Sequence, residues 1–272
     1  MMPVNLLIVR HGESLGNLAN RMRERGDLSL AERLRGTHTA HWPLTKKGTE
    51  QAKANGVFLN KMCREHSMFF DLFYVSSYSR AMKTAGLLEI IRAEWVIDPR
   101  ITERDWGDLD NYTEEERREK FAQAITLHTV EPFFWAPHNG ESFKDLIIRI
   151  RDFIDTLVRA DVPNVIVVCH GEVMKAFRIL FQQMTPMEYK EMEFSKDPLK
   201  RIHNCQIDHY SRRNPETLKC DIARLGYLQI YRPSEGKDIA VPWRELPRKR
   251  FSSDELLREA NKLSHPFRDI DL

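Results

Sequence analysis

The stretch Leu6-Leu7-Ile8-Val9-Arg10-His11-Gly12-Glu13-Ser14 decides the fold assignment. Its apolar run is typical of a buried strand in a parallel sheet, and the run ends abruptly at a charged residue. Residues that follow such strands lie at the carboxyl edge of the sheet, where open α/β folds bind their ligands. The Arg10 guanidinium fits phosphate oxygens, and a neutral His11 imidazole beside it is a potential nucleophile. This segment alone is equally compatible with a strand that ends in ordinary polar loop residues.

Strand-like and helix-like segments alternate along most of the chain. The expected strands are residues 4–9, 72–76, 95–98 and 164–169, and the expected helices are residues 46–61, 80–92, 142–159 and 173–183. This alternation predicts an α/β fold with a mostly parallel central sheet and helices on both faces. Two further strand-like segments, residues 207–210 and 225–231, are joined through the Asn214-Pro215 turn. Their pairing predicts one late antiparallel edge strand.

The pattern changes in the last part of the chain. We expect a main domain over residues 1–232, with charged insertions near 18–41 and 105–139. Residues 233–272 are rich in proline and basic side chains. This composition predicts a basic C-terminal extension, with a short helix at residues 253–263.

The composition excludes several classes of function. A chain of 272 residues with 42% apolar content has enough material for a sizeable core. A net charge of +2 gives no reason to expect a nucleic-acid partner. The four cysteines are scattered without a CxxC spacing, which argues against a zinc site and for reduced thiols. With no apolar run long enough to span a bilayer, we expect a cytoplasmic protein without membrane partners, and its oligomeric state stays open.

Four expected strand ends supply reactive side chains. Arg10 and His11 follow the first strand, Arg80 begins the helix after the second, Glu103 follows the third, and His170 follows the strand at 164–169. Because parallel strands end at the same edge of a sheet, we expect these side chains to converge there. The predicted site therefore combines two arginines, two histidines and one carboxyl group.

This set of side chains suits phosphoryl transfer from a phosphomonoester. Two arginine forks stabilise the negative charge that is spread over the transferring group. One neutral imidazole attacks phosphorus, which gives a phosphohistidine, and the other donates a hydrogen bond to the same oxygens. A carboxylic acid protonates the leaving oxygen and then activates water. The arginines and the histidine supply the positive charge, so no metal and no cofactor is expected.

Further motifs, in order along the chain, make a family resemblance specific. They are Arg10-His11-Gly12-Glu13-Ser14 with Asn17, Pro43-Leu44-Thr45 with Gly48 and Gln51-Ala52, Ser79-Arg80-Ala81 with Thr84-Ala85, Glu103 with Gly107, Gly140-Glu141-Ser142, and His170-Gly171. Together they resemble the histidine phosphatase superfamily, the phosphoglycerate mutase-like group, over about residues 4–232. The resemblance implies a three-layer α/β/α sandwich.

The resemblance also implies a role for individual residues. His11 would be the phosphorylated nucleophile and Glu103 the proton donor. Three residues, Arg10, Arg80 and His170, would complete the phosphate pocket. Further substrate contacts would come from Asn17 and from the backbone around Gly171 and Glu172.

Two segments depart from the cofactor-dependent mutases of that family. Arg104-Asp105-Trp106 replaces a pattern with a tyrosine before Gly107, and Glu172-Val173-Met174-Lys175 replaces an Asn-Ser-Leu-Arg pattern. These departures favour a phosphatase over a mutase. An acidic side chain in a phosphate pocket would repel substrate, so we expect that of Glu172 to point away and its backbone N–H to be used.

The leading hypothesis is metal-independent hydrolysis of a phosphorylated small molecule through a phosphohistidine. The insertions near 18–41 and 105–139 would wall the site and select the substrate. Two alternatives stay open. A mutase would pass the phosphoryl group to a second hydroxyl of the substrate, and a non-catalytic module would only bind a phosphorylated ligand.

Overall fold

A mixed sheet forms the centre of the molecule. The computed structural model describes residues 1–112, 116, 119–195, 197, 201–220, 222–246, 248 and 250–263. The strands among these residues are β1 (Asn5–Arg10), β2 (Leu72–Val75), β3 (Trp95–Ile97), β4 (Asn164–Cys169), β5 (Ile207–Ser211), β6 (Tyr227–Arg232) and β7 (Lys237–Glu245). These seven described strands lie in the order β3-β2-β4-β1-β5-β6-β7.

The register of the sheet brings the predicted strand ends together. β1 is central and pairs in parallel with β4, so that Arg10 lies opposite Cys169. β4 pairs in parallel with β2, and β2 with β3. On its other side β1 pairs with β5, which begins the antiparallel part of the sheet with β6 and β7. The mostly parallel sheet and the late antiparallel pairing are both confirmed.

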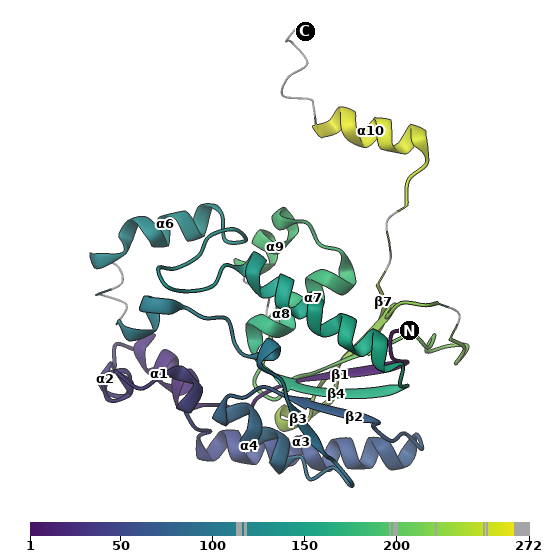
Figure 1. Cartoon of the computed structure of the whole chain (residues 1–272), viewed down its shortest axis with the longest axis horizontal. Coiled ribbons are helices and arrows are strands. Elements are labelled where there is room, and N and C mark those ends of the chain that lie inside the picture. Colours follow the sequence, from purple (N-terminus) through teal and green to yellow (C-terminus); the bar gives the residue numbers. More distant parts are fainter. Residues whose placement is uncertain are drawn as a thin grey trace, which may run out of the picture.

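Helices cover both faces of the sheet (Figure 1). One face carries α3 (Lys46–Glu65) and α4 (Ser79–Leu87), and the other carries α7 (Phe143–Ala160), α8 (Gly171–Gln182) and α9 (Pro186–Glu193). Leu7 and Val9 belong to the same buried cluster as the α3 and α4 side chains, and Leu6 and Ile8 to that of α7 and α8. Because both faces of β1 are buried, its sequence is a continuous apolar run rather than an alternating one. The predicted three-layer α/β/α sandwich is confirmed.

Short helices lie outside the two main helical layers. They are α1 (Leu15–Arg23), α2 (Ser29–Leu34), η1 (Thr39–His41), η2 (Pro99–Ile101), η3 (Gly107–Asn111), α6 (Ala122–Val130) and η4 (Pro233–Glu235). Most of them fall in the two segments that were expected to be insertions. Part of the second segment, residues 113–115 and 117–118, lies outside the described residues.

The C-terminal extension contains a strand that the sequence did not reveal. β7 pairs with β6 and carries two register irregularities, a proline at position 242 and several exposed side chains. Prolines, charges and bulges are typical of an edge strand, and they hide the alternation by which strands are recognised. The sheet thus continues to Glu245, and the domain boundary at residue 232 stays a prediction.

After β7, α10 (Ser253–Leu263) forms over the residues that were expected to be helical, and it lies apart from the sheet in Figure 1. None of the helices in the described ranges has the length and hydropathy that crossing a bilayer requires.

Two glycines allow the loop after β1 to pack directly on the start of α3. A Cβ atom at Gly12 would collide with the carbonyl oxygen of Gly48, and one at Gly48 would collide with the carbonyl oxygen of Glu13. The Thr45 N–H donates to the same Glu13 oxygen at 2.9 Å, which places the N-cap of α3 against this loop. The position of His11 therefore depends on a backbone-to-backbone contact that has no space for a side chain.

We predict that Gly48→Ala lowers the free energy of unfolding by about 1–3 kcal/mol. The reason is that the added methyl group would collide with the backbone of Glu13, which is packed against α3. Gly86→Ala is the matched control, because Gly86 is an exposed α4 residue with nothing within 4 Å of the added methyl group. Alanine's helix propensity should make the control neutral or more stable by up to about 1 kcal/mol. Urea unfolding of both variants measures the difference, and equal stabilities would contradict the close-approach argument.

Candidate active site

A cavity of about 300 Å³ opens at the carboxyl edge of the parallel strands. Five of the predicted site residues line it: Arg10, His11, Asn17, Arg80 and Glu103. They come from the end of β1, from α1, from the start of α4 and from the segment after η2. Side chains separated by more than ninety positions in the sequence thus share one cavity, as the strand order requires.

His11 is buried, and its hydrogen bonds determine its tautomer. Arg80 Nε donates to His11 Nε2 at 3.1 Å, and His11 Nδ1 lies 2.6 Å from the Gly12 carbonyl oxygen. An arginine has no acceptor atom, so Nε2 must accept and Nδ1 must carry the proton. Burial and the nearby Arg80 and Arg10 charges hold the pKa of His11 well below its ordinary value of 6.5. The imidazole is therefore neutral at physiological pH, with its lone pair on Nε2.

The two arginines are held by backbone carbonyl groups rather than by carboxylates. Arg80 Nη1 donates to the Thr39 carbonyl oxygen, and Arg10 Nη1 to the Ile202 carbonyl oxygen, both at 2.6 Å. Arg10 Nε is buried without a hydrogen-bond partner among the described residues. Carbonyl groups orient a guanidinium without neutralising its charge, so both arginines keep a net positive charge for an anion in the cavity.

His170 lies next to His11 at the end of β4. The two ring centroids are 5.1 Å apart in an edge-on arrangement, and His170 Nε2 lies 2.7 Å from the Ser76 hydroxyl. His170 Nδ1 is buried without a partner in the described part of the chain. Burial and the neighbouring Arg80, His11 and Arg10 hold the pKa of His170 well below 6.5. A buried ring nitrogen without a partner is unusual in a folded protein, and it marks His170 as a residue with a vacant hydrogen-bonding position.

Two backbone N–H groups hold one carboxyl oxygen of Glu103. Its Oε1 accepts the Arg104 N–H at 3.0 Å and the Glu172 N–H at 3.2 Å. Burial and, after it, the negative charge of Glu172 raise the pKa of Glu103, although Arg80 and Arg10 act in the opposite direction. A carboxyl group with a raised pKa beside two arginines is suited to hold a proton and release it during a reaction.

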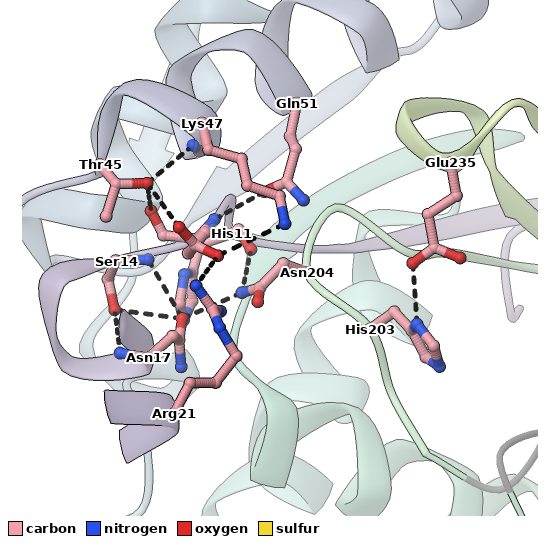
Figure 2. A network of polar contacts seen from close by, with 12 residues as sticks. His11, Ser14, Asn17, Arg21, Thr45, Lys47, Gln51, His203, Asn204 and Glu235 are labelled. Atoms are coloured by element: carbon pink, nitrogen blue, oxygen red, sulfur yellow. Dashed lines mark hydrogen bonds and ion pairs between the residues drawn. The ribbon is translucent and has the colours of Figure 1, made fainter. Parts of the chain in front are cut away.

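Asn17 is fixed by the loop that follows β1 (Figure 2). Its Oδ1 accepts from the Ser14 N–H at 3.1 Å, as part of the capping box of α1, and from Asn204 Nδ2 at 3.0 Å. With its oxygen occupied in this way, the Asn17 amide group is left to contact a ligand in the cavity through its NH₂.

Gly171 and Glu172 begin α8 and do not line the cavity. A Cβ atom at Gly171 would lie 3.5 Å from Arg10 Nε, so this helix terminus packs directly on the Arg10 side chain. The Glu172 side chain lies outside the cavity, as expected, and contacts Lys175 Nζ at 2.7 Å. Its N–H group contacts Glu103 rather than the cavity.

Several groups that hold the cavity residues in place were not found from the sequence. Asn204 donates to the His11 carbonyl oxygen at 3.2 Å as well as to Asn17 (Figure 2). It lies in an irregular segment before β5, where neither periodicity nor a motif marks a functional position. The Thr39 backbone carbonyl that holds Arg80 belongs to the first insertion, and a backbone group carries no sequence signal at all.

The outer part of the cavity is built by both predicted insertions and by residues next to them. The first segment contributes Asn20, Thr39 and Arg23, whose buried Nε has no hydrogen-bond partner among the described residues. Trp42 follows it and packs against Gly16. From the second segment come Asp110 and Trp106, and the Trp106 ring lies 4.6 Å from the Arg104 guanidinium. These side chains are chemically mixed, whereas the inner part of the cavity contains the two guanidinium groups of Arg10 and Arg80.

Curated relatives of this chain include enzymes that transfer or remove phosphoryl groups. A 2,3-bisphosphoglycerate-dependent phosphoglycerate mutase of Bartonella henselae is 27% identical over 197 residues, which are 70% of this chain and 87% of the mutase. A 6-phosphofructo-2-kinase/fructose-2,6-bisphosphatase of Gallus gallus is 25% identical over 247 residues, which are 88% of this chain and 46% of that protein.

Solved structures with the same fold include phosphatases. The α-ribazole phosphatase of Shigella flexneri superposes with a TM-score of 0.60 at 22% identity, over 78% of this chain and 92% of that one. A mycobacterial glucosyl-3-phosphoglycerate phosphatase, in complex with inorganic phosphate, gives a TM-score of 0.57 at 22% identity. The match covers 76% of this chain and 89% of that one. Residues 6–211 match the sequence model of the histidine phosphatase superfamily, branch 1. The chain, whose fold and cavity agree with this match, belongs to the histidine phosphatase superfamily.

Proposed function

We propose that this protein is a metal-independent phosphomonoesterase that works through a phosphohistidine at His11. The observation that carries the proposal is the hydrogen bond from Arg80 Nε to His11 Nε2 at 3.1 Å. It leaves a neutral imidazole whose lone pair lies among cationic donors. A phosphate group that enters the cavity accepts the arginine N–H groups in place of His11, and this frees Nε2 to attack phosphorus.

In the first step, His11 Nε2 forms a bond to phosphorus while the ester P–O bond breaks. Glu103 gives its proton to the departing oxygen, which leaves as an alcohol. Arg10 and Arg80 bind the non-bridging oxygens, and His170 donates a further hydrogen bond to them. For this step the Ser76 hydroxyl, which lies 2.7 Å from His170 Nε2, donates to that nitrogen, so that the ring proton is on Nδ1. His170 Nδ1 is the ring nitrogen that has no partner among the described residues.

In the second step, water attacks phosphorus while the bond between phosphorus and His11 Nε2 breaks. The Glu103 carboxylate takes a proton from this water, so the enzyme returns to its starting state and releases inorganic phosphate. Asn17 and the α8 terminus at Gly171 and Glu172 would support the phosphate and the residues around it. Since the arginines carry the charge stabilisation, the proposed chemistry assigns no step to a metal ion.

The substrate is proposed to be a phosphorylated small molecule that the two insertions select. The cavity holds about 300 Å³, which suits a small metabolite rather than a protein segment. Outside the phosphate end, the ligand would meet Arg23 together with the Trp42 and Trp106 rings.

A mutase is the second candidate, because curated relatives such as the Bartonella henselae enzyme are phosphoglycerate mutases. The two candidates share the phosphohistidine and differ only in the acceptor, which is water for a phosphatase and a substrate hydroxyl for a mutase. The departures at Arg104-Asp105-Trp106 and at Glu172 favour the phosphatase.

We predict that the purified protein releases inorganic phosphate from members of a panel of phosphorylated metabolites and from an aryl phosphate. His11→Ala should lower the rate to background, since it removes the attacking atom. Phosphate release and isomerisation of 3-phosphoglycerate are measured in parallel. Isomerisation without net release of phosphate would show that the mutase proposal is the right one.

Glu103→Gln should lower turnover strongly for alkyl phosphates and weakly for aryl phosphates. An alkoxide is a poor leaving group that needs a proton, and general acids of this kind contribute about 10²–10⁴-fold. A nitrophenolate leaves without protonation, so the loss should be much smaller with p-nitrophenyl phosphate. The ratio of the two losses is the measurement, and equal losses would remove Glu103 from the acid role.

A further inference from the structure

Glu172 is a largely buried carboxylate next to Glu103. The proposed catalytic steps assign no role to its side chain. Its N–H donates to Glu103 Oε1 at 3.2 Å, and its side chain is 14% exposed. Its Oε1 is bound by Lys175, while its Oε2 is buried without a partner among the described residues. A negative charge is thus held close to the proposed acid without being part of the cavity.

One lysine, Lys175, forms ion pairs with two buried carboxylates, Glu172 and Glu193. Lys175 Nζ lies 2.7 Å from Glu172 Oε1 and 2.6 Å from Glu193 Oε2. Burial alone would raise the pKa of Glu172, but Lys175, together with Arg104 and Arg10, holds that pKa below its ordinary value. Burial, reinforced by Glu172, raises the pKa of Glu193. Glu172 is therefore the member of the group that stays ionised.

Charged and titratable groups reach Glu103 from every element around it. Arg10 comes from β1, Arg80 from α4 and Glu172 from α8, while Arg104 in its own segment acts through its backbone N–H. The Tyr78 hydroxyl and the Cys169 thiol also interact with Glu103 electrostatically. The two cavity arginines favour a carboxylate, whereas burial and Glu172 favour the protonated acid. Glu172 is the only anionic side chain among the residues that act most strongly on Glu103 in the described structure.

We propose that Glu172 is a positioning residue that keeps Glu103 ready as a proton donor. Its N–H, together with that of Arg104, fixes Glu103 Oε1, so that the acid proton sits on Oε2. Its negative charge offsets the two arginines and keeps this proton in place between turnovers. The inference rests on the proposed function, because it presupposes that Glu103 protonates the leaving group.

The chain offers a matched pair of variants. Glu172→Gln and Glu193→Gln each replace a carboxyl group that contacts Lys175 Nζ, but only Glu172 contacts Glu103. The glutamine keeps the size and backbone of the original residue. Damage to the buried Lys175 group should affect both variants alike, whereas loss of a charge beside Glu103 should affect only Glu172→Gln.

The experiment records kcat against pH for an alkyl phosphate with the full-length enzyme. The alkaline limb of the profile, which reports deprotonation of the acid, should move to lower pH by about one unit in Glu172→Gln. It should stay at the wild-type position in Glu193→Gln and in the charge-conserving variant Glu172→Asp. A Glu172→Gln profile that superimposes on the wild-type profile, or equal shifts in the two glutamine variants, would overturn the proposal.

A second measurement does not require Glu172→Gln to fold. The infrared difference spectrum between wild type and Glu103→Gln at neutral pH should contain the carbonyl stretch of a protonated carboxyl group. Its absence would show that Glu103 is ionised at rest and would overturn the inference. Failure of the proposed function would look different, because wild-type enzyme would then release no phosphate or Glu103→Gln would be fully active.

Discussion

The hydrogen bond from Arg80 Nε to His11 Nε2 is the interaction on which the rest of the site depends. Because an arginine can only donate, this bond fixes the histidine tautomer, and burial among cations keeps the ring neutral. It also requires the start of α4 to meet the end of β1. The Gly12 N–H strengthens this contact by donating to Thr84 Oγ1 at 3.0 Å, and Thr84 lies four residues after Arg80 in α4.

The same constraint explains why the surroundings of Arg10 and Arg80 and those of Glu103 differ electrostatically. Buried guanidinium groups held by backbone carbonyl groups keep their charge and favour an anionic ligand. Burial, followed by these charges, lowers the pKa of His11 and of His170. A carboxyl group placed among such cations would normally be ionised. Glu103 has a raised pKa because burial and the Glu172 carboxylate act against the arginines. A carboxyl group with a raised pKa and an imidazole with a lowered pKa thus lie within one cavity.

Much of this arrangement could be predicted from the sequence, because local patterns determine it. Apolar runs that end at Arg10 and at His170 mark buried parallel strands, and the parallel register then brings these ends together. Other features depend on tertiary contacts that leave no local pattern. β7 is an irregular edge strand, Asn204 lies in a segment without periodicity, and the Thr39 group that holds Arg80 is a backbone carbonyl. The outward turn of Glu172 was expected from charge repulsion, but its lysine partner was not.

The central claim is that His11 carries the phosphoryl group during turnover. The most direct test is a rapid acid-free quench of the enzyme with a labelled phosphomonoester, followed by peptide mapping. The account predicts a transient, acid-labile phosphoryl group on the peptide that contains His11. The label should be absent in His11→Ala, and in Glu103→Gln its level at steady state should change with the leaving group. A phosphoryl group on another residue, or turnover without any labelled protein under single-turnover conditions, would contradict the account.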